Sequence, residues 1–549
     1  MRKNMIWKSL CLIPLFLTGC IDDKGNYDYN EVAELTISNV PELIEVLGYV
    51  ERIQVSPKIV SSLEGEIKAG DPNFTVQYRL GYKGMGSLGG YDYENSKSIA
   101  FVDVTPESGF DLDIPANYLP ESYVCWMTVT DNRTNVTTSK QFYINVSSTT
   151  SEGWLVLCNE GSEERARVDM ISQLTSTRIE AIHDVANGMP ETHHATCMSF
   201  VPKQSNPGDV ITVFTHEKDY ELDQETLESD DSKDFNLNNF SIEPGETLFK
   251  EYTFAASSYS WLMKYRFGFA ESGNAYCLVG GSAGEAYGLP INTSEPGMDV
   301  EFRVAPYCGY SWVRPWSGSY AANVLFYDID NKRFVYFNGG SNFYSEYLCM
   351  FPIDDPEGAL FSYTTGKEMV YMEGTSRNGL VCAILQDAAG NRSLYGINMA
   401  GTKPAQEIYI DKVEAPDFDK ATSFAFYSKG PLMYYAVGNK VYQYNYATKA
   451  YRQVTEVALG ANEEITQIKF NLFRTAVYSS LNKYGSDEFM NKQYQLIVSS
   501  YDNTASGTDN GKVSFYNIAQ DGLDYTVSKD TEYTGFAKIV DVVYRERTN

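Results

Sequence analysis

The sequence predicts an all-β chain in which an N-terminal β-sandwich is followed by a seven- or eight-bladed β-propeller-like domain. The 549 residues include 42 tyrosines, 28 phenylalanines and 42 glycines but few long apolar runs, which is typical of half-buried strands separated by turns. Residues 31–148 end in a clear hairpin pattern, and a strand–turn–strand pattern recurs along residues 149–549. A chain of this length exceeds one ordinary core, so we expect at least two domains.

Residues 1–19 have the pattern of an export signal. Basic residues give a positive start, and the apolar segment 10–17 is too short to span a bilayer. Small residues then lead directly into Cys20, as in the lipobox of bacterial lipoproteins. This similarity implies that the signal is removed before Cys20, which becomes an N-terminus anchored by several acyl chains. The alternative is a plain secretory signal with an incidental cysteine.

Residues 20–30 form an acidic, polar tether that cannot fold alone. The stretch CIDDKGNYDYNE, which begins at Cys20, resembles the start of PKD-like family lipoproteins of Bacteroidetes, and the resemblance extends over the domain that follows. It implies a lipid-anchored protein of the cell outer membrane that faces the extracellular side. It also implies an association with SusC/SusD-type transporters, as an accessory component of nutrient uptake.

The charge balance excludes one class of partner. Lysine and arginine number 44 against 72 aspartates and glutamates, which gives a formal net charge of −28. Such a surface repels nucleic acid, so we expect no nucleic-acid partner.

Apart from Cys11 and Cys20, seven cysteines remain at wide spacings and without a CxxC motif. This pattern favours buried free thiols over a disulfide framework or a zinc site.

The end of the segment 31–148 is its clearest part. In residues 122–131, alternate side chains of a strand would share one face: Tyr123, Cys125, Met127 and Val129. A turn follows at residues 132–135, and residues 141–146 form the returning strand. This hairpin resembles the last two strands of a PKD or immunoglobulin-type domain, which implies a spacing or binding module without catalysis. Asp131, at the end of the first strand, fits a turn better than a calcium site.

From residue 149 onward, a strand, a short polar turn and a returning strand recur, as in propeller blades. The segments with this pattern are residues 324–337, 394–398, 440–454 and 513–518. About 400 residues at roughly 45 to 57 per blade give seven or eight blades. Apolar strands at residues 153–158 and 537–544 suit a ring that closes by letting terminal strands share a blade. The alternative is two or three further sandwiches.

The sequence contains no catalytic signature. No GxSxG elbow, P-loop or dinucleotide-binding fingerprint occurs, and no carboxylate pair stands out among the 72. The four histidines fall between residues 183 and 216 without a zinc-binding spacing, so we expect loop histidines, no metal site and no cofactor. Calcium could be coordinated by residues 502–503 and 508–511, although these segments fit turns better. Residues 217–234 are expected to form a solvated acidic loop.

One aromatic cluster is a candidate ligand-binding site. Residues 307–320 hold two of the six tryptophans, and their glycines and proline make the stretch loop-like. Exposed aromatic rings stack on sugars or hold peptide side chains, and an arginine can bind a carboxylate. The candidate ligand-binding residues are Tyr307, Tyr310, Trp312, Arg314 and Trp316. The alternative interpretation is that both tryptophans pack between blades.

These observations predict a non-catalytic surface lipoprotein that binds an extracellular nutrient, a glycan or a peptide, beside a SusC/SusD-type importer. Two alternatives stay open: a surface-anchored propeller hydrolase or lyase acting on polysaccharide, and an adhesion or protein-interaction module. The central pocket of the propeller discriminates among them. Paired carboxylates in an aromatic pocket would favour the enzyme, and the same pocket without them would favour capture. A plugged pocket with a flat apolar face would favour adhesion.

Overall fold

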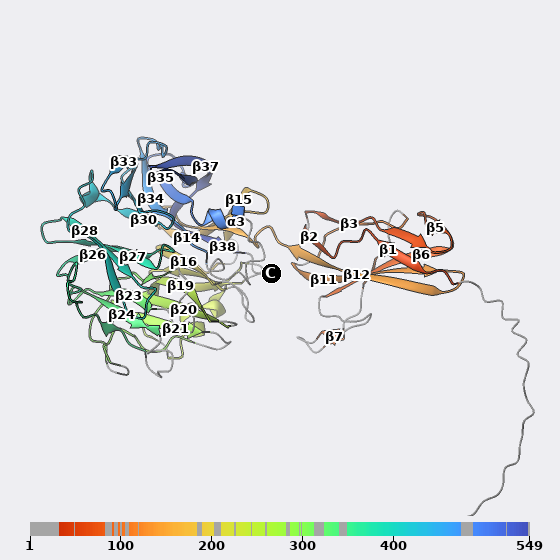
Figure 1. Cartoon of the computed structure of the whole chain (residues 1–549), viewed down its shortest axis with the longest axis horizontal. Helices are drawn as coiled ribbons and strands as arrows, with labels where there is room; N and C mark the ends of the chain where they lie inside the picture. Colours follow the sequence, from red (N-terminus) through yellow and green to blue (C-terminus); the bar gives the residue numbers. More distant parts are fainter. Residues whose placement is uncertain are drawn as a thin grey trace, which may run out of the picture. The chain divides into compact units, whose positions relative to one another are not determined.

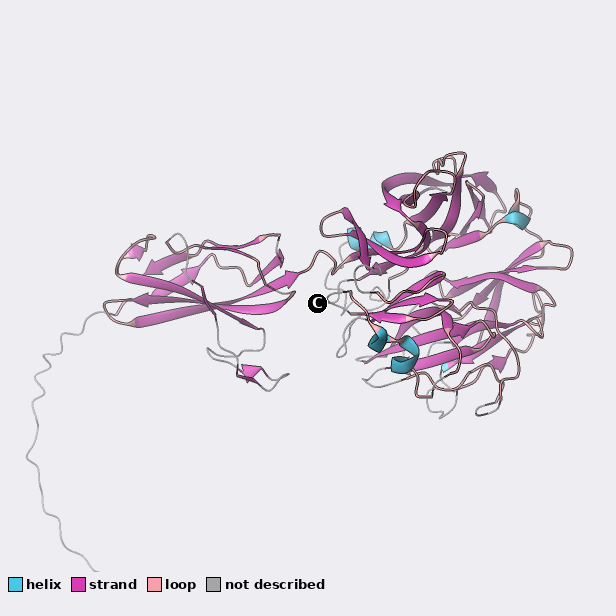
Figure 2. Cartoon of the chain, turned by 180° about the vertical axis from the view of Figure 1, so that it is seen from behind, coloured by secondary structure: helices cyan, strands magenta, loops and turns pink. Residues whose placement is uncertain are grey.

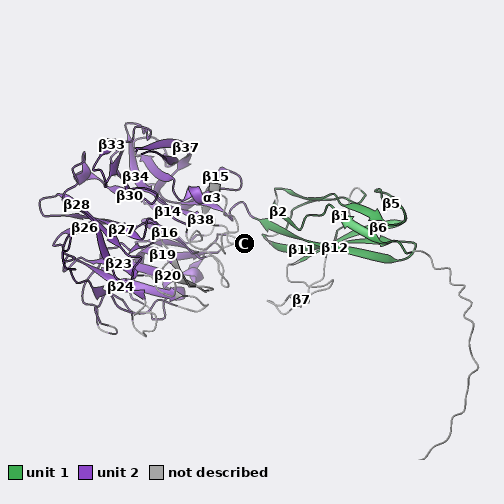
Figure 3. Cartoon of the chain, in the orientation of Figure 1, with its two compact units in different colours: residues 1–147 green, residues 148–549 purple. Residues whose placement is uncertain are grey.

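Strands make up almost all of the regular structure, and the helices are few and short (Figure 2). The computed structural model describes residues 32–48, 50–82, 91–92, 97–98, 102–104, 109–118, 120–183, 189–201, 210–223, 227–242, 244–258, 261–280, 286–295, 297, 299–311, 323–339, 348–473, 487–522 and 524–546. Within these ranges, no helix is long and apolar enough to cross a membrane. The chain divides into two units, Met1–Ser147 and Ser148–Asn549, which are described separately (Figure 3).

The first unit is a β-sandwich with one shared hydrophobic core (Figure 1). One sheet has the strand order β2–β12–β11–β6–β9, and its core partners are two smaller sheets, β1–β4–β5 and β10–β3. The bounds are β1 Leu35–Ser38, β2 Leu43–Leu47, β3 Arg52–Val55, β4 Lys58–Ser61, β5 Gly65–Glu66, β6 Phe74–Tyr82, β7 Tyr91–Asp92, β8 Lys97–Ser98, β9 Val102–Val104, β10 Leu112–Pro115, β11 Glu121–Asp131 and β12 Val136–Ser147.

The predicted hairpin at the end of the sandwich is confirmed. β11 pairs antiparallel with β12, from Glu121 opposite Val146 to Asp131 opposite Val136. The side chains expected to share one face are all buried in the core: Tyr123, Cys125, Met127 and Val129. Asp131 acts as a turn residue, because its carboxylate accepts hydrogen bonds from the backbone and side chain of Arg133.

The second unit is a propeller whose described residues form seven sheets, here called blades 1 to 7. Blade 1 has the strand order β15–β14–β13–β38, and the other six follow one another along the chain. Blades 2 and 3 are β16–β18 and β19–β21, blades 4 and 5 are β22–β25 and β26–β29, and blades 6 and 7 are β30–β33 and β34–β37. The propeller-like prediction is therefore confirmed with seven blades, and the alternative of further sandwiches is wrong.

The propeller elements have the following bounds. They are β13 Gly153–Glu160, β14 Arg165–Ser172, β15 Thr177–His183, β16 Ala195–Val201, β17 Val210–Thr215, β18 Tyr220–Leu222, η2 Asp231–Lys233, α1 Phe235–Asn239, β19 Leu248–Ser258, β20 Trp261–Ala270, β21 Ala275–Gly280, β22 Gly309–Tyr310, β23 Asn323–Asp328, β24 Arg333–Asn338, β25 Phe351–Pro352, β26 Glu368–Gly374, β27 Leu380–Gln386, β28 Arg392–Asn398, β29 Ala405–Ile410, η3 Phe418–Lys420, β30 Ser423–Tyr427, β31 Leu432–Val437, β32 Lys440–Asn445, β33 Tyr451–Gln453, β34 Glu463–Lys469, α3 Asp487–Lys492, β35 Leu496–Asp502, β36 Gly511–Asp521, β37 Asp524–Phe536 and β38 Lys538–Arg545.

The ring closes in blade 1, as the two terminal apolar strands predict. β38 pairs antiparallel with β13, with Tyr544 opposite Trp154, so the last strand of the chain is the innermost strand of the first blade. The Trp154 ring lies 4.8 Å from that of Tyr544 and 4.9 Å from that of Phe515 in blade 7. This aromatic contact seals the closing blade against its neighbour and leaves no open inner edge.

One expectation fails. Residues 217–234 are not simply a solvated loop, because β18 adds the third strand to blade 2 within them. Tyr220, Leu222 and Leu227 are buried, and the carboxylate of Asp219 accepts a hydrogen bond from the backbone of Thr215 at 2.8 Å. The high charge of this segment concealed three apolar residues that suffice to anchor it.

We predict that Trp154→Ala destabilises the propeller by about 3 to 5 kcal/mol, because it removes a buried aromatic side chain from the closing seam. Tyr451→Ala is the matched control, since Tyr451 lies on an outer strand and is 53% exposed; its cost should stay near about 0.5 kcal/mol. Urea denaturation of the chain from residue 21 measures both. Equal effects of the two substitutions would contradict the role given to the seam.

Candidate functional site

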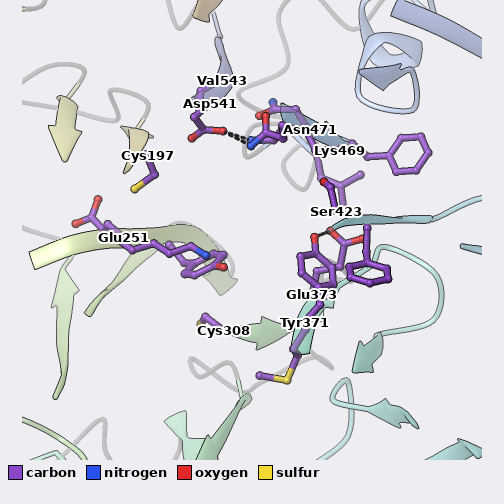
Figure 4. A pocket seen from close by; sticks show the side chains of 18 of the residues that line it. Cys197, Glu251, Cys308, Tyr371, Glu373, Ser423, Lys469, Asn471, Asp541 and Val543 are labelled. Carbon is purple, nitrogen blue, oxygen red and sulfur yellow. Dashed lines mark hydrogen bonds and ion pairs between the residues drawn. The ribbon is translucent and has the colours of Figure 1, made fainter. Parts of the chain in front are cut away.

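The inner strands of all seven blades surround one cavity of about 280 Å³ (Figure 4). Its lining comes from β16, β19, β22, β26, β30, β34 and β38 together with residues that flank them. Around its centre, Figure 4 shows Cys197, Asp541, Lys469, Ser423, Glu373 and Cys308 in turn. This cavity is therefore the central channel of the propeller, a place where such folds commonly hold ligands.

Lys250, near the start of β19, brings a positive charge to the channel wall. Its side chain is half-buried, with the ammonium 5.1 Å from the ring centre of Tyr252 and 4.6 Å from that of Tyr307. Burial lowers the pKa of the Lys250 amine. No carboxylate of the described residues forms an ion pair with it. The two tyrosine rings provide cation–π contacts, and Asp541 favours the charged form of Lys250 without forming an ion pair with it.

Glu373, on β26, is a carboxyl group that titrates near neutral pH. One of its oxygens accepts a hydrogen bond from the backbone N–H of Phe426 on β30, and the other accepts one from the Tyr371 hydroxyl at 2.9 Å. Burial raises the pKa of Glu373 to about 7, although these hydrogen bonds and Lys469 act in the opposite direction. The channel thus contains a group that changes charge within the physiological pH range.

The second channel carboxylate, Asp541 on β38, is fully engaged in contacts between blades. Lys469 of β34 approaches it at 2.7 Å, and Gln467 and the backbone of Met198 donate hydrogen bonds to it at 3.1 Å. Burial acts to raise the pKa of Asp541, but Lys469 and these donors together hold it below the usual range. Because its partners come from blades 2 and 7, Asp541 acts as a structural link.

A run of aromatic rings, here called the aromatic arc, passes along three blades beside the channel: Tyr307, Tyr371 and Phe424. The rings of Tyr307 and Tyr371 lie 5.5 Å apart, as do those of Tyr371 and Phe424. The Tyr307 hydroxyl donates to the carbonyl of Val370 at 2.9 Å, which fixes its ring between blades 4 and 5. The Phe424 ring is buried in the core between blades 5 and 6, whereas Tyr371 lines the cavity and is only partly buried, so Tyr371 is the member of the arc that can offer ring surface to a bound molecule.

The candidate residues from the sequence divide into two groups. Tyr310 lines the channel, and its ring stacks on Phe254 with centroids 3.7 Å apart, while Tyr307 belongs to the aromatic arc. The others lie outside the described residues: Cys20, Trp312, Arg314 and Trp316. Sequence reasoning missed Lys250 and Glu373, which are single residues on separate strands. The one feature of the sequence that could have indicated them is a charged residue within a strand that also contains apolar residues.

The described histidine rings pair with separate carboxylates. His193 contacts Glu217 at 3.0 Å, His194 contacts Glu164 at 3.1 Å, and His216 contacts Glu271. In the part of the chain that the structure describes, no group of three or more histidine, cysteine, aspartate or glutamate side chains is arranged to hold a metal ion. These histidines are surface residues of loops and strand ends.

Comparisons with known proteins identify one sequence family. Residues 20–192 match the PKD-like family, a span that covers the sandwich and continues into the first blade. No curated protein matches the sequence. Among solved structures, a quinoprotein alcohol dehydrogenase-like protein from Bacteroides thetaiotaomicron is 10% identical, with 94% of this chain and 97% of that chain covered and a TM-score of 0.37.

Two further structures are similar at the same low level. The β-propeller domain of the Trilobed protease from Pyrococcus furiosus is 11% identical, covering 75% of this chain and 96% of that chain, with a TM-score of 0.30. The SapL1 lectin in complex with α-methyl fucoside is 12% identical, covering 62% of this chain and 97% of that chain, with a TM-score of 0.27.

The raised pKa of Glu373 predicts a pH dependence of stability. The protonated carboxyl stabilises the fold fully below about pH 4.5, and this contribution, up to about 3 kcal/mol, is lost as the pH rises through about 7. Glu373→Gln, which is always neutral, should flatten the decline in the free energy of unfolding between pH 5 and pH 8. Glu464→Gln on the exposed part of β34 is the control and should leave the pH profile of the wild type unchanged. An unaltered slope in Glu373→Gln would refute the assignment.

Proposed function

We propose that this chain is a surface-exposed lipoprotein of the outer membrane that captures an extracellular nutrient, a glycan or a peptide, in its propeller channel without catalysis. The observation that carries the proposal is the channel itself: inner strands of all seven blades contribute to one cavity with ring surface, hydrogen-bonding groups and a cationic side chain. Such a combination suits the binding of a polar ligand.

The carboxylates of the channel support capture over hydrolysis. Glycoside hydrolysis needs two carboxyl groups that both face the scissile bond. Asp541 is held by Lys469, and Glu251 points away from the cavity toward Arg266, with which it forms an ion pair at 2.7 Å (Figure 4). Among the described lining residues, Glu373 is the one carboxyl group without a basic side chain as ion-pair partner.

The N-terminal half of the proposal rests on the sequence. Cys20 would carry the lipid, residues 20–30 would form the tether, and the sandwich would act as a spacer. The match of residues 20–192 to the PKD-like family supports this role for the sandwich. A tethered channel beside a SusC/SusD-type importer would gain from high local concentration, so that modest affinity suffices for retention.

A binding and turnover screen tests the capture function. The chain from Ile21 is titrated against polysaccharides and peptide digests, and product is sought by chromatography. We expect binding without product, weakened in Lys250→Met. Trp312→Ala and Trp316→Ala test the loop that the sequence singled out. Product formation would refute the non-catalytic role, and binding lost only in the tryptophan variants would place the site outside the channel. No binding to any sample would favour adhesion instead.

Lipidation is tested separately at Cys20. In cells expressing the full chain, Cys20→Ser should abolish incorporation of labelled palmitate and release the protein from the membrane fraction, because no acyl chain would remain to anchor it. Cys11→Ser alters a cysteine within the signal and serves as the control, which should still be labelled. Equal labelling of both variants would contradict the anchor.

A further inference from the structure

The charged side chains that line the channel are not all engaged in ion pairs. The charged lining residues are Lys250, Glu251, Glu373, Lys469 and Asp541. Three of them form ion pairs: Glu251 binds Arg266, which lies outside the lining, at 2.7 Å, and Lys469 and Asp541 bind each other at 2.7 Å. Glu373 is bonded to neutral donors. Lys250 is therefore the cation of the wall that forms no ion pair with a carboxylate of the described chain, since Asp541, which also favours its charge, is bonded to Lys469.

A half-buried ammonium is costly unless an anion or acceptors replace its lost hydration. The tyrosine rings that contact Lys250 supply part of that compensation. However, the face of an aromatic ring has no lone pair that could accept a hydrogen bond from the three N–H donors of the ammonium. A carboxylate would supply charge-assisted hydrogen bonds of the strongest kind. Lys250 therefore favours the binding of a ligand that carries a carboxylate group.

The remaining polar atoms of the cavity favour a sugar as the rest of that ligand. Among the residues that the structure describes, the amide nitrogen of Asn471, a residue that is only 7% exposed, has no hydrogen-bond acceptor, and the amide oxygen of Gln467 has no donor. Both residues line the cavity. A hydroxyl group both donates and accepts, so it satisfies either atom. The partly buried ring of Tyr371 adds aromatic surface of the kind on which a pyranose stacks.

We infer that the channel binds an acidic saccharide, with its carboxylate on Lys250, its hydroxyl groups on Asn471 and Gln467, and a sugar ring against Tyr371. This inference rests on the proposed function and specifies the ligand of the same site. An acidic peptide would also satisfy Lys250, but its backbone would not make equal use of the ring surface.

Glu373 gives the inference a second readout. The ionisable groups coupled to it are Tyr371 on the same strand, Tyr252 from β19, Cys382 from β27 and Lys469 from β34. Burial raises the pKa of Tyr252, Tyr371 and Cys382, so these three stay neutral between pH 5 and pH 8. Ionisation of Glu373 through about pH 7 should then repel a bound carboxylate.

Calorimetric titration with matched ligands tests the inference. The probes are oligosaccharides of galacturonate, mannuronate, glucuronate and sialic acid, the carboxyl-reduced neutral form of each, and a glutamate-rich peptide. We expect at least one acidic oligosaccharide to bind, with affinity about 10- to 100-fold lower for its reduced form and for Lys250→Met. Lys440→Met, at the exposed first residue of β32, is the control and should bind as the wild type does. Affinity should fall between pH 6 and pH 8 in the wild type and fall less in Glu373→Gln.

Each other outcome is distinct. Equal affinity for an acidic oligosaccharide and its reduced form, with Lys250→Met unaffected, would overturn the inference and leave capture by the channel intact. Binding of the peptide alone, dependent on Lys250, would overturn the saccharide assignment. Binding of none of the acidic oligosaccharides would overturn the inference, and the neutral polysaccharides and peptide digests of the wider screen would then decide the capture function separately.

Discussion

The propeller depends on one long-range pairing, that of β38 with β13. The Tyr544 hydroxyl donates to the Glu152 carboxylate at 2.6 Å although the two residues are 392 positions apart in the chain. Bringing such distant segments together costs loop-closure entropy, which the largely buried β-ladder and the Trp154 contacts offset. The same pairing places Asp541 beside Lys469 and Met198. The channel wall is therefore complete only when the ring is closed.

The buried arginine at the junction of blades 1 and 7 is paired with carboxylates, in contrast to Lys250 in the channel. Arg167 of blade 1 is bonded to Asp169 at 2.9 Å and to Glu160 at 2.7 Å, and it reaches Asp509 of blade 7 at 2.9 Å. Breaking such a pair leaves an uncompensated buried charge, which is strongly destabilising. These junctions are satisfied by the chain itself. Lys250 differs because no carboxylate of the described wall forms an ion pair with it, and that difference favours a binding site over a packing interface.

The features that could be predicted from the sequence are those that depend on the pattern of neighbouring residues. Strand alternation around Met127 and Val129, the turn at Asp131, and the terminal strands that hold Trp154 and Tyr544 all follow from local pattern and from the requirement to close a ring. The channel could not be predicted in this way. Each inner strand contributes only a few residues to it, so Lys250 and Glu373 share no spacing, and their neighbourhood is set by blade order alone.

The acidic surface and an acidic ligand are compatible on physical grounds. The formal net charge of −28 is spread over the chain, and at physiological ionic strength its field is screened beyond about 8 Å. Exposed carboxylates farther away than this affect a molecule in the channel little, whereas a half-buried ammonium within contact distance is hardly screened at all. The distant field thus lowers the rate of encounter, while Lys250 determines what is retained once contact is made. A tethered protein can rely on short-range contacts to select its ligand. Its tether already supplies the high local concentration that long-range electrostatic steering would otherwise provide.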